Sequence, residues 1–141
     1  MNIQDLRQKA ESGSVVAQSI LGVCYLDGID TKVDYTEALR FLSAAAEKGA
    51  PRALAGLAGM YAEGLGVPRD PAKAVRLYEA SAERGEFLAQ MELARIFSRG
   101  LGVAVDPESA LKWYSAAAAQ EGSVGDGEDI QEAKAYIAGR R

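Results

Sequence analysis

The chain has 141 residues, a formal net charge of −4 from 20 acidic and 16 basic side chains, and no histidine. This length suits one modest domain, so residues 1–141 are expected to form a single one. The basic residues form no block, which argues against nucleic acid as a partner because phosphate binding requires concentrated positive charge. Cys24 is the only cysteine, so neither a disulfide framework nor a Cys/His zinc set can be built within the chain.

The chain start is polar and has no hydrophobic region typical of a secretory signal. No apolar run approaches the length of a membrane span. Together with the lone cysteine, these features favour a cytoplasmic protein without a membrane partner.

The first predicted element is a helix over residues 2–12, which resembles the second half of a helical hairpin. Asn2 is a suitable residue to cap its first turn. Terminal elements of repeat arrays depart from the repeat pattern because one of their faces meets water. We therefore expect 2–12 to be an N-terminal cap helix.

A 36-residue repeat follows, in three units over 13–48, 49–84 and 85–121. Glycine, alanine, leucine and aromatic residues return at the same place in each unit: Gly13, Gly49 and Gly85; Ala17, Ala53 and Ala89; Leu21, Leu57 and Leu93; Tyr25, Tyr61 and Phe97; Gly28, Gly64 and Gly100. A fixed period of this length predicts a solenoid, in which each unit buries its apolar face against its neighbours.

Each unit is predicted to be a helix–turn–helix hairpin. In the middle unit, apolar and small residues recur at helical spacing from Ala53 to Tyr61, and Gly64 suits the left-handed conformation that ends a helix. Asp70 and Pro71 suit the capping and first positions of the second helix. Leu57 lies on the buried stripe, so its truncation to alanine is expected to cost roughly 2–5 kcal/mol.

The last segment departs from the repeat. One extra residue precedes Gly122, residues 123–127 are expected to form a loop, and Ile130, Ala133 and Ile137 place an apolar stripe on a helix over 127–138. We expect this helix to be a C-terminal cap and residues 139–141 to fray.

The repeat resembles the Sel-one-like repeat, a relative of the tetratricopeptide repeat. The middle unit carries the resemblance in AGLAGMYAEGLGVPRDPAKAVRLYEASAERG and the third in LARIFSRGLGVAVDPESALKWYSAAA, whereas the first departs in its loop at Asp30 and Thr31. The resemblance covers residues 10–122. It implies an all-α, right-handed solenoid of antiparallel helix pairs, whose first helices line a concave face. It also implies a role as an adaptor or scaffold, with no catalytic motif and no cofactor.

Sequence features that suggest enzyme chemistry have simpler structural explanations. The glycine-rich stretches 64–69 and 100–105 lie at equivalent repeat positions, follow no strand and lack the Gly-Lys-Ser/Thr ending of a phosphate loop. The acidic stretch 126–129 is too short for a calcium loop. Cys24 falls on the apolar stripe, and Asp27 and Glu63 are the only suggestive carboxylates. We therefore predict no enzyme and no metal site.

A helical wheel with Leu21 in the core predicts which residues of the first helices face the concave side. These are Val16, Ser19, Val23, Leu26 and Asp27; Arg52, Ala55, Gly59, Ala62 and Glu63; and Leu88, Met91, Arg95, Ser98 and Arg99. The candidate partner-binding residues are Arg52, Ala55, Gly59, Glu63, Leu88, Met91, Arg95 and Arg99. Two alternatives stay open: the N-terminal helix covers Val16, Val23 and Leu26, or the arginines are ordinary solvated side chains.

Arg52, Arg95 and Arg99 are expected to converge on an acidic group of a partner, since the planar guanidinium binds a carboxylate through two hydrogen bonds. Replacing Arg95 and Arg99 by alanine is then expected to weaken binding by about 2 kcal/mol or more and leave the fold intact. The sequence thus favours a monomeric module that binds a protein or peptide, with a dedicated inhibitor or immunity-type protein as the alternative.

Overall fold

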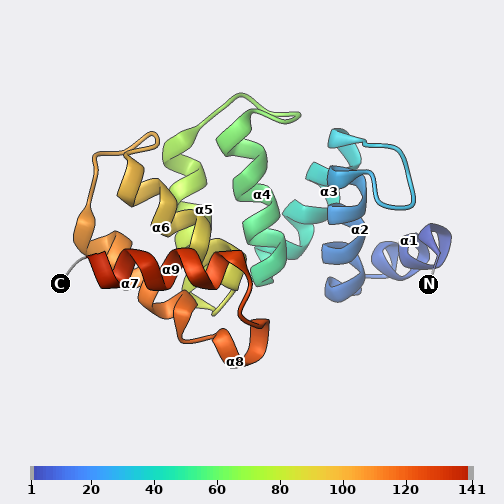
Figure 1. The fold of residues 1–141 in the computed structure, drawn as a ribbon. Helices are drawn as coiled ribbons and strands as arrows, with labels where there is room; N and C mark the ends of the chain where they lie inside the picture. The colour runs from blue at the N-terminus through green and yellow to red at the C-terminus, as the bar shows by residue number, and fades with distance from the viewer. Residues whose placement is uncertain (1, 140–141) are drawn as a thin grey trace.

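The computed structural model describes residues 2–139, and within that range it is entirely helical, without a strand (Figure 1). The helices are α1 (Ile3–Glu11), α2 (Val15–Asp27), α3 (Tyr35–Glu47), α4 (Pro51–Glu63), α5 (Pro71–Glu83), α6 (Phe87–Arg99), α7 (Pro107–Ala118), α8 (Glu121–Val124) and α9 (Glu128–Gly139). Residues 140 and 141 of the expected frayed end lie outside the described residues.

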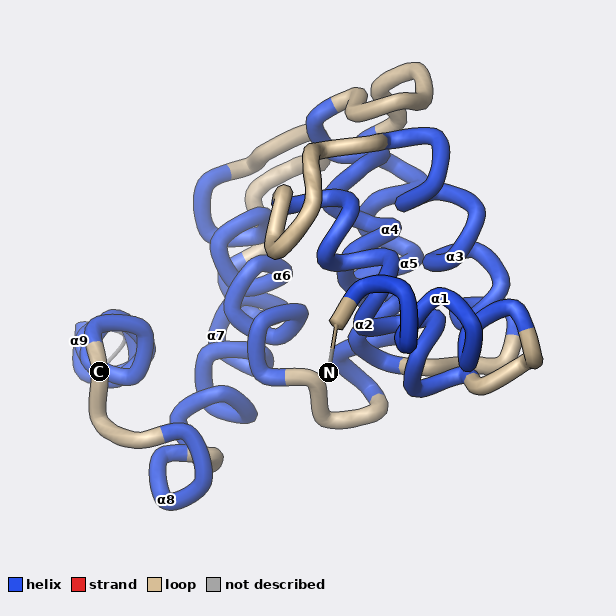
Figure 2. The backbone as a smooth tube through the Cα atoms, turned by 90° about the vertical axis from the view of Figure 1, so that its right-hand side faces the viewer, coloured by secondary structure: helices blue, strands red, loops and turns tan. Residues whose placement is uncertain are grey.

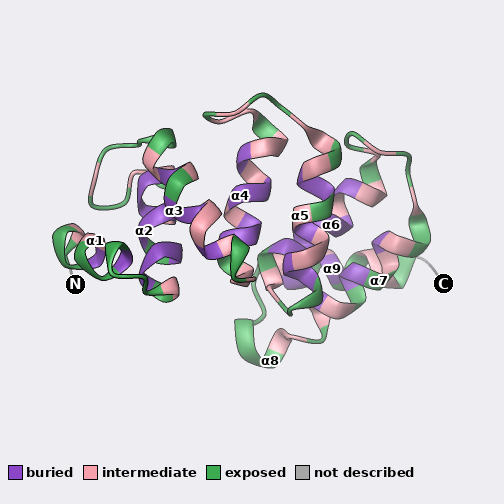
Figure 3. Ribbon diagram, turned by 180° about the vertical axis from the view of Figure 1, so that it is seen from behind, coloured by how far each residue is buried: buried purple, intermediate pink, exposed green. Residues whose placement is uncertain are grey.

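Three helix pairs form the array: α2 packs on α3, α4 on α5, and α6 on α7. Each pair also contacts the next, because α3 packs on α4 and α5 on α6, so the pairs follow one another between the two ends of the molecule (Figure 1). Buried residues run through the inner faces of the pairs, whereas α1, α8 and the loops are largely exposed (Figure 3). This arrangement confirms the predicted all-α array of paired helices.

The predicted helix boundaries rest on two devices that recur in all three pairs. An aspartate caps each second helix by accepting a hydrogen bond from the backbone N–H three residues later, at 3.1 Å in Asp34, Asp70 and Asp106. A glycine ends each first helix in the left-handed conformation, with φ of 70°, 71° and 70° at Gly28, Gly64 and Gly100. The repeated sequence therefore produces repeated local structure.

The first interhelical loop carries Asp30 where the other two carry glycine, and the packing between repeats explains why. Gly66 and Gly102 have positive φ, and a Cβ there would lie 2.6 Å from Tyr35 Cβ and 2.5 Å from Pro71 Cβ, at the start of the preceding unit's second helix. The first unit has no preceding unit. Asp30 occupies the equivalent position and keeps a positive φ of 59°.

Close helix packing in the core depends on Leu42, which is fully buried. A Cβ at Gly22 would lie 2.6 Å from Leu42 Cδ2, and one at Gly56 would lie 3.2 Å from Leu42 Cδ1. The leucine therefore occupies space that two glycines, one on α2 and one on α4, leave open. Leu57 on the predicted stripe is also buried, with 7% of its surface exposed.

Beyond the three pairs, α1 lies at the N-terminal end and α8 and α9 lie at the C-terminal end, and charged side chains hold α1 on the array. At the N-terminus, Arg7 of α1 donates to the Tyr25 hydroxyl at 2.7 Å and lies 2.7 Å from Glu37, while Arg40 of α3 contacts Glu11 at 2.8 Å. At the C-terminus, α9 packs on α7 and is viewed down its axis at one side of the molecule in Figure 2. The repeats thus lie between two terminal helices.

The start of the loop expected over 123–127 belongs instead to α8. The amides of Ser123 and Val124 donate to the Gln120 carbonyl at 2.8 and 3.0 Å, which forms one helical turn. A single turn without buried residues has no hydrophobic periodicity, so the sequence pattern did not reveal it.

Of the helices over 2–139, none combines the length and the apolar character that crossing a membrane requires.

Candidate functional site

An open groove of about 500 Å³ lies on the face formed by the first helices α2, α4 and α6. It is lined by Val23, Leu26, Asp27, Arg52, Ala55, Gly56, Gly59, Glu63, Leu65, Tyr78, Glu86, Leu88 and Glu92. The lining combines an apolar floor with charged residues at the sides. A surface of this size and mixture suits a side chain or short segment of a ligand.

The groove is hollow in the middle because the central first helix lacks side chains at two positions. Gly59 of α4 is equivalent to Val23 of α2 and Arg95 of α6, and Gly56 is equivalent to Ile20 and Glu92. Leu42 lies close to Gly56 and accounts for that glycine. A Cβ at Gly59, by contrast, would meet only the Tyr78 hydroxyl, at 3.6 Å. Packing therefore does not require glycine at position 59.

Five of the eight candidate binding residues lie in this groove: Arg52, Ala55, Gly59, Glu63 and Leu88. Ala55 forms part of the floor and is 5% exposed, whereas Leu88 is 52% exposed. Val23, Leu26 and Asp27, which the wheel assigned to the same face, line the groove too. The structure thus brings these side chains together, and their contact with a partner stays a prediction.

The prediction that Met91 contacts a partner is wrong. Met91 is fully buried and belongs to the core, so it presents no surface to a partner. Ser19 and Ala55 are buried at the equivalent positions. The wheel of an isolated helix assumes one buried side. In a stacked array the neighbouring units also cover part of each first helix, and this position faces them.

The prediction that Arg95 binds a carboxylate of a partner is also wrong, because carboxylates of this chain already pair with its guanidinium. It lies 2.9 Å from Glu92, 2.7 Å from Asp129 and 2.9 Å from Glu132, the last two on α9. Glu132 also accepts a hydrogen bond from the Tyr114 hydroxyl at 2.8 Å. The carboxylate expected from a partner is supplied by α9, so removing Arg95 is expected to loosen α9. Arg99 stays 59% exposed, 3.8 Å from Glu132.

The N-terminal helix does not cover the concave side of α2. Leu6 and Ala10 of α1 join the core with Ala17 and Leu21, on the buried side of α2. Val16 remains 70% exposed, and Val23 lines the open groove. The alternative in which α1 closes the first-unit face is therefore wrong.

Tyr78 of α5 is a groove residue that the candidate binding residues predicted from the sequence did not include. The residue is only 7% exposed, yet it lines the groove, and its hydroxyl makes no hydrogen bond with the described residues. Burial, followed by the nearby carboxylates of Glu92 and Glu63, raises the pKa of Tyr78 well above its usual range. The hydroxyl therefore stays protonated at physiological pH. The sequence feature that could have pointed to Tyr78 is its repeat position, which is the same as that of Tyr114, another aromatic residue with a hydroxyl.

The groove is acidic. Asp27, Glu63 and Glu86 form no ion pair with residues 2–139, and Glu92 is shared with Arg95. Arg52 is the only basic residue in the lining, at the opposite end of α4 from Glu63. The arginine-lined surface expected from the sequence is thus replaced by a mainly acidic one.

Replacing Gly59 by alanine is expected to stabilise the fold by up to about 1 kcal/mol, because alanine favours the helix and the new methyl group meets only the Tyr78 hydroxyl. Gly22→Ala is the matched control and should destabilise, since its methyl group would overlap Leu42. Urea unfolding followed by circular dichroism measures both. Equal losses for the two variants would contradict the open space at position 59.

The attachment of α9 is expected to weaken in acid. The hydrogen bond from Arg95, followed by that from Tyr114, holds the pKa of Glu132 below its usual range, despite partial burial. A lowered folded-state pKa stabilises the fold above the ordinary glutamate pKa, about 4.3, and this contribution is lost as the pH falls through the folded-state value. Glu132→Gln should therefore show a smaller loss of stability between pH 6 and pH 3 in urea unfolding. An unchanged loss would mean that protonation of Glu132 does not weaken the attachment of α9 in acid.

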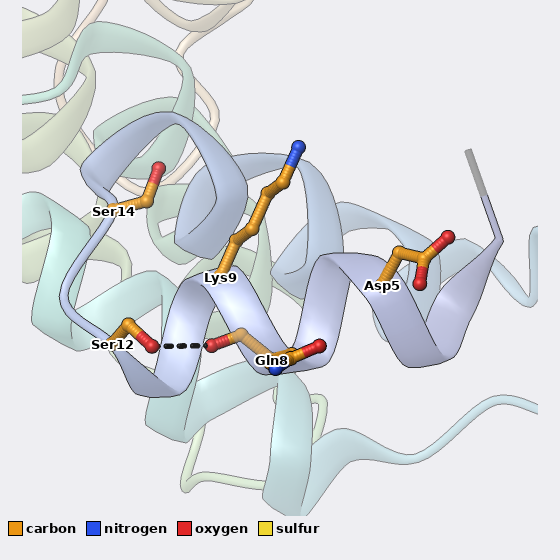
Figure 4. Close-up of a pocket in the computed structure, with 5 residues that line it drawn as sticks. All are labelled: Asp5, Gln8, Lys9, Ser12 and Ser14. Atoms are coloured by element: carbon orange, nitrogen blue, oxygen red, sulfur yellow. Dashed lines mark hydrogen bonds between the residues drawn. The ribbon is translucent and has the colours of Figure 1, made fainter.

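A second hollow, also about 500 Å³, lies beside α1 and is a weaker candidate. Its lining side chains, Asp5, Gln8, Lys9, Ser12 and Ser14, come from one helix and the turn after it and point in different directions (Figure 4). The serines serve local structure: Ser12 donates to the Gln8 carbonyl at 2.9 Å, and Ser14 caps α2. The polar groups do not converge.

Residues 2–139 contain no cluster of three acidic or cysteine side chains placed to hold a metal ion. Cys24 is buried as predicted, and burial, followed by Asp30 and Asp27, raises the pKa of its thiol. A raised pKa disfavours the nucleophilic thiolate.

The successive helix pairs define a helical repeat protein. A family model described as the Sel1 repeat matches residues 15–49, 51–86 and 88–122, so the chain belongs to the Sel1 repeat family. Members of this family are helical modules that typically take part in protein interactions and are generally not catalytic. No curated protein matches the chain at a significant level.

Solved structures similar to this chain include a Sel1 repeat protein and a protein with an SLR fold. The Sel1 repeat protein from Oxalobacter formigenes is 42% identical, with 96% of both chains covered and a TM-score of 0.76. The protein c5321, a protective antigen present in uropathogenic Escherichia coli strains and displaying an SLR fold, is 35% identical, with a TM-score of 0.78. That match covers 99% of this chain and 33% of the other, so the present chain spans about a third of the antigen's length.

Proposed function

We propose that this protein is a non-catalytic interaction module that binds a peptide or protein surface in the groove between α2, α4 and α6. The observation that supports this most is the empty space above Gly59. A glycine inside a helix costs about 1 kcal/mol relative to alanine, and no side-chain packing requires it at this position. A ligand that approaches the backbone closely explains its presence.

The groove also has the composition of a binding surface. Leu88 is 52% exposed at its side, where a solvated apolar side chain gains free energy by contact with a partner. Polar groups that lack partners within the described residues, such as Glu63 and the Tyr78 hydroxyl, supply specificity. Both an adaptor and an inhibitor use such a surface, and we favour the adaptor on the family's usual role.

Affinity capture with a groove-blocked variant tests the proposal. Gly59→Leu places a side chain in the hollow, where its Cβ would meet only the Tyr78 hydroxyl, and circular dichroism checks that the variant keeps its helices. Arg76→Leu adds the same side chain at an exposed position of α5 outside the groove lining. Tagged wild type and Arg76→Leu should retain the same protein from the source cells, and Gly59→Leu should lose it. Equal retention by all three would place binding elsewhere.

A further inference from the structure

The hydroxyl of Tyr78, which reaches the groove from an otherwise buried side chain and makes no hydrogen bond with the described residues, marks one point of the groove. Tyr78 is 7% exposed, and its hydroxyl lies 3.6 Å from the Cβ position of Gly59, at the base of the hollow. A ligand that covers this hydroxyl excludes water from it, and burying a polar group without a hydrogen bond is unfavourable, so a ligand group that supplies the hydrogen bond is favoured there. The hydroxyl therefore identifies where a polar group of a ligand belongs.

The same chain shows how its other tyrosine hydroxyls near charged residues are satisfied. Tyr25 accepts a hydrogen bond from Arg7 Nη1 at 2.7 Å, and Tyr61 accepts one from Lys73 Nζ at 3.2 Å. Tyr114 instead donates to Glu132, which Arg95 also holds. A phenol hydroxyl thus pairs with a cation, or with a carboxylate when an arginine lies beside it.

The surroundings of Tyr78 favour the cation. In the third unit, Arg95 and Arg99 lie beside Tyr114 and attract the carboxylate of α9. In the second unit the equivalents of these arginines are Gly59 and Glu63, so the polarity around the hydroxyl is reversed. Glu63 has no ion-pair partner among the described residues, and Glu92 of α6, one of whose oxygens also pairs with Arg95 at 2.9 Å, lines the same groove.

We propose that the groove receives a lysine or arginine side chain of a partner polypeptide above Gly59. Its N–H groups donate to the Tyr78 hydroxyl and to the carboxylates of Glu63 and Glu92, and its aliphatic stem lies along Leu26 and Leu88. The basic residue of the lining, Arg52, is seven residues from Gly59, roughly 10 Å along the helix, and does not occupy this position.

This inference rests on the proposed function, and peptide selection tests the two separately. Random 12-residue peptides displayed on phage are selected on the wild-type protein, and clones that also bind Gly59→Leu are discarded. The remaining clones are groove binders. They are expected to be enriched in lysine and arginine, and a synthetic peptide from this set should bind about 10-fold more weakly when its basic residue is changed to glutamine.

A double-mutant cycle then assigns the protein side of the contact. Tyr78→Phe and Glu63→Gln should each weaken the basic peptide several-fold, with little effect on its glutamine form. Glu108→Gln, an exposed acid at the start of α7, should change neither. Fluorescence anisotropy measures all combinations, and circular dichroism checks that each variant keeps its helices.

The possible results separate the two claims. Groove binders whose affinity is unchanged by the lysine- or arginine-to-glutamine change, or whose required residue is acidic, overturn the cation site and leave the groove as the binding surface. Failure to recover any clone that Gly59→Leu rejects counts against both. If Glu63→Gln and Glu108→Gln have equal effects, general attraction by the acidic surface accounts for the preference for basic peptides. That result also overturns the inference.

Discussion

Replacing Leu42 by alanine is expected to lower the free energy of unfolding by about 2–5 kcal/mol. Leu42 is fully buried and lies against the backbone at Gly22 and Gly56, two residues that have no side chain to fill the space it leaves. The loss combines the transfer of buried methyl groups with the cavity that remains. Because Leu42 contacts both α2 and α4, the variant weakens the contact between two units as well as within one.

Urea unfolding followed by circular dichroism measures this change. Leu101→Ala is the control, because Leu101 is 51% exposed and its truncation should cost little. If the Leu42 variant lost less than about 1 kcal/mol, the close packing of α2 and α4 around this side chain would be wrong.

Replacing Arg95 by alanine is expected to release α9, at a local cost of about 2–3 kcal/mol. The guanidinium, 19% exposed, holds two carboxylates of α9, Asp129 and Glu132. Its removal leaves Asp129 and Glu92 without an ion-pair partner and Glu132 with only Arg99, at 3.8 Å. Hydrogen exchange of the α9 amides should accelerate by roughly 30- to 150-fold, whereas exchange in α2 and α3 should not change.

Arg99→Ala provides the matched control for this second effect. Arg99 is 59% exposed and its nearest carboxylate oxygen lies 3.8 Å away, so its loss should change α9 exchange only slightly. Similar acceleration in both variants would show that general charge, rather than the Arg95 contacts, holds α9.

The repeat made most of the fold predictable. Helix ends are set by local contacts, such as the cap at Asp70 and the left-handed glycine at Gly64. These contacts span only a few residues, so one unit predicts them, and their return in each unit supports the prediction. The single turn of α8 was not predictable, because its hydrogen bonds leave no periodic pattern. The positive φ of Asp30, which it shares with the glycines at the same position of the other two units, was not predictable from the sequence either.

The site was predictable only in part. Positions such as Gly59 and Leu88 follow from one helical wheel, and both line the groove. Burial of Met91, occupation of Arg95 by α9, and exposure of the Tyr78 hydroxyl to the groove each depend on a neighbouring helix. A wheel describes one helix at a time, so it grouped Gly59 and Leu88 but showed neither the burial of Met91 nor the pairing of Arg95 with α9, and contact of the groove with a partner stays a prediction.

Site-specific photo-crosslinking tests the central claim, that the groove between α2, α4 and α6 is the binding surface. A photoreactive phenylalanine analogue is placed at position 59 or 88 in the groove, or at exposed position 76 of α5 as the control. The account predicts that irradiation in extracts of the source cells joins the same partner to positions 59 and 88 and not to 76. Crosslinking from position 76 alone would contradict it.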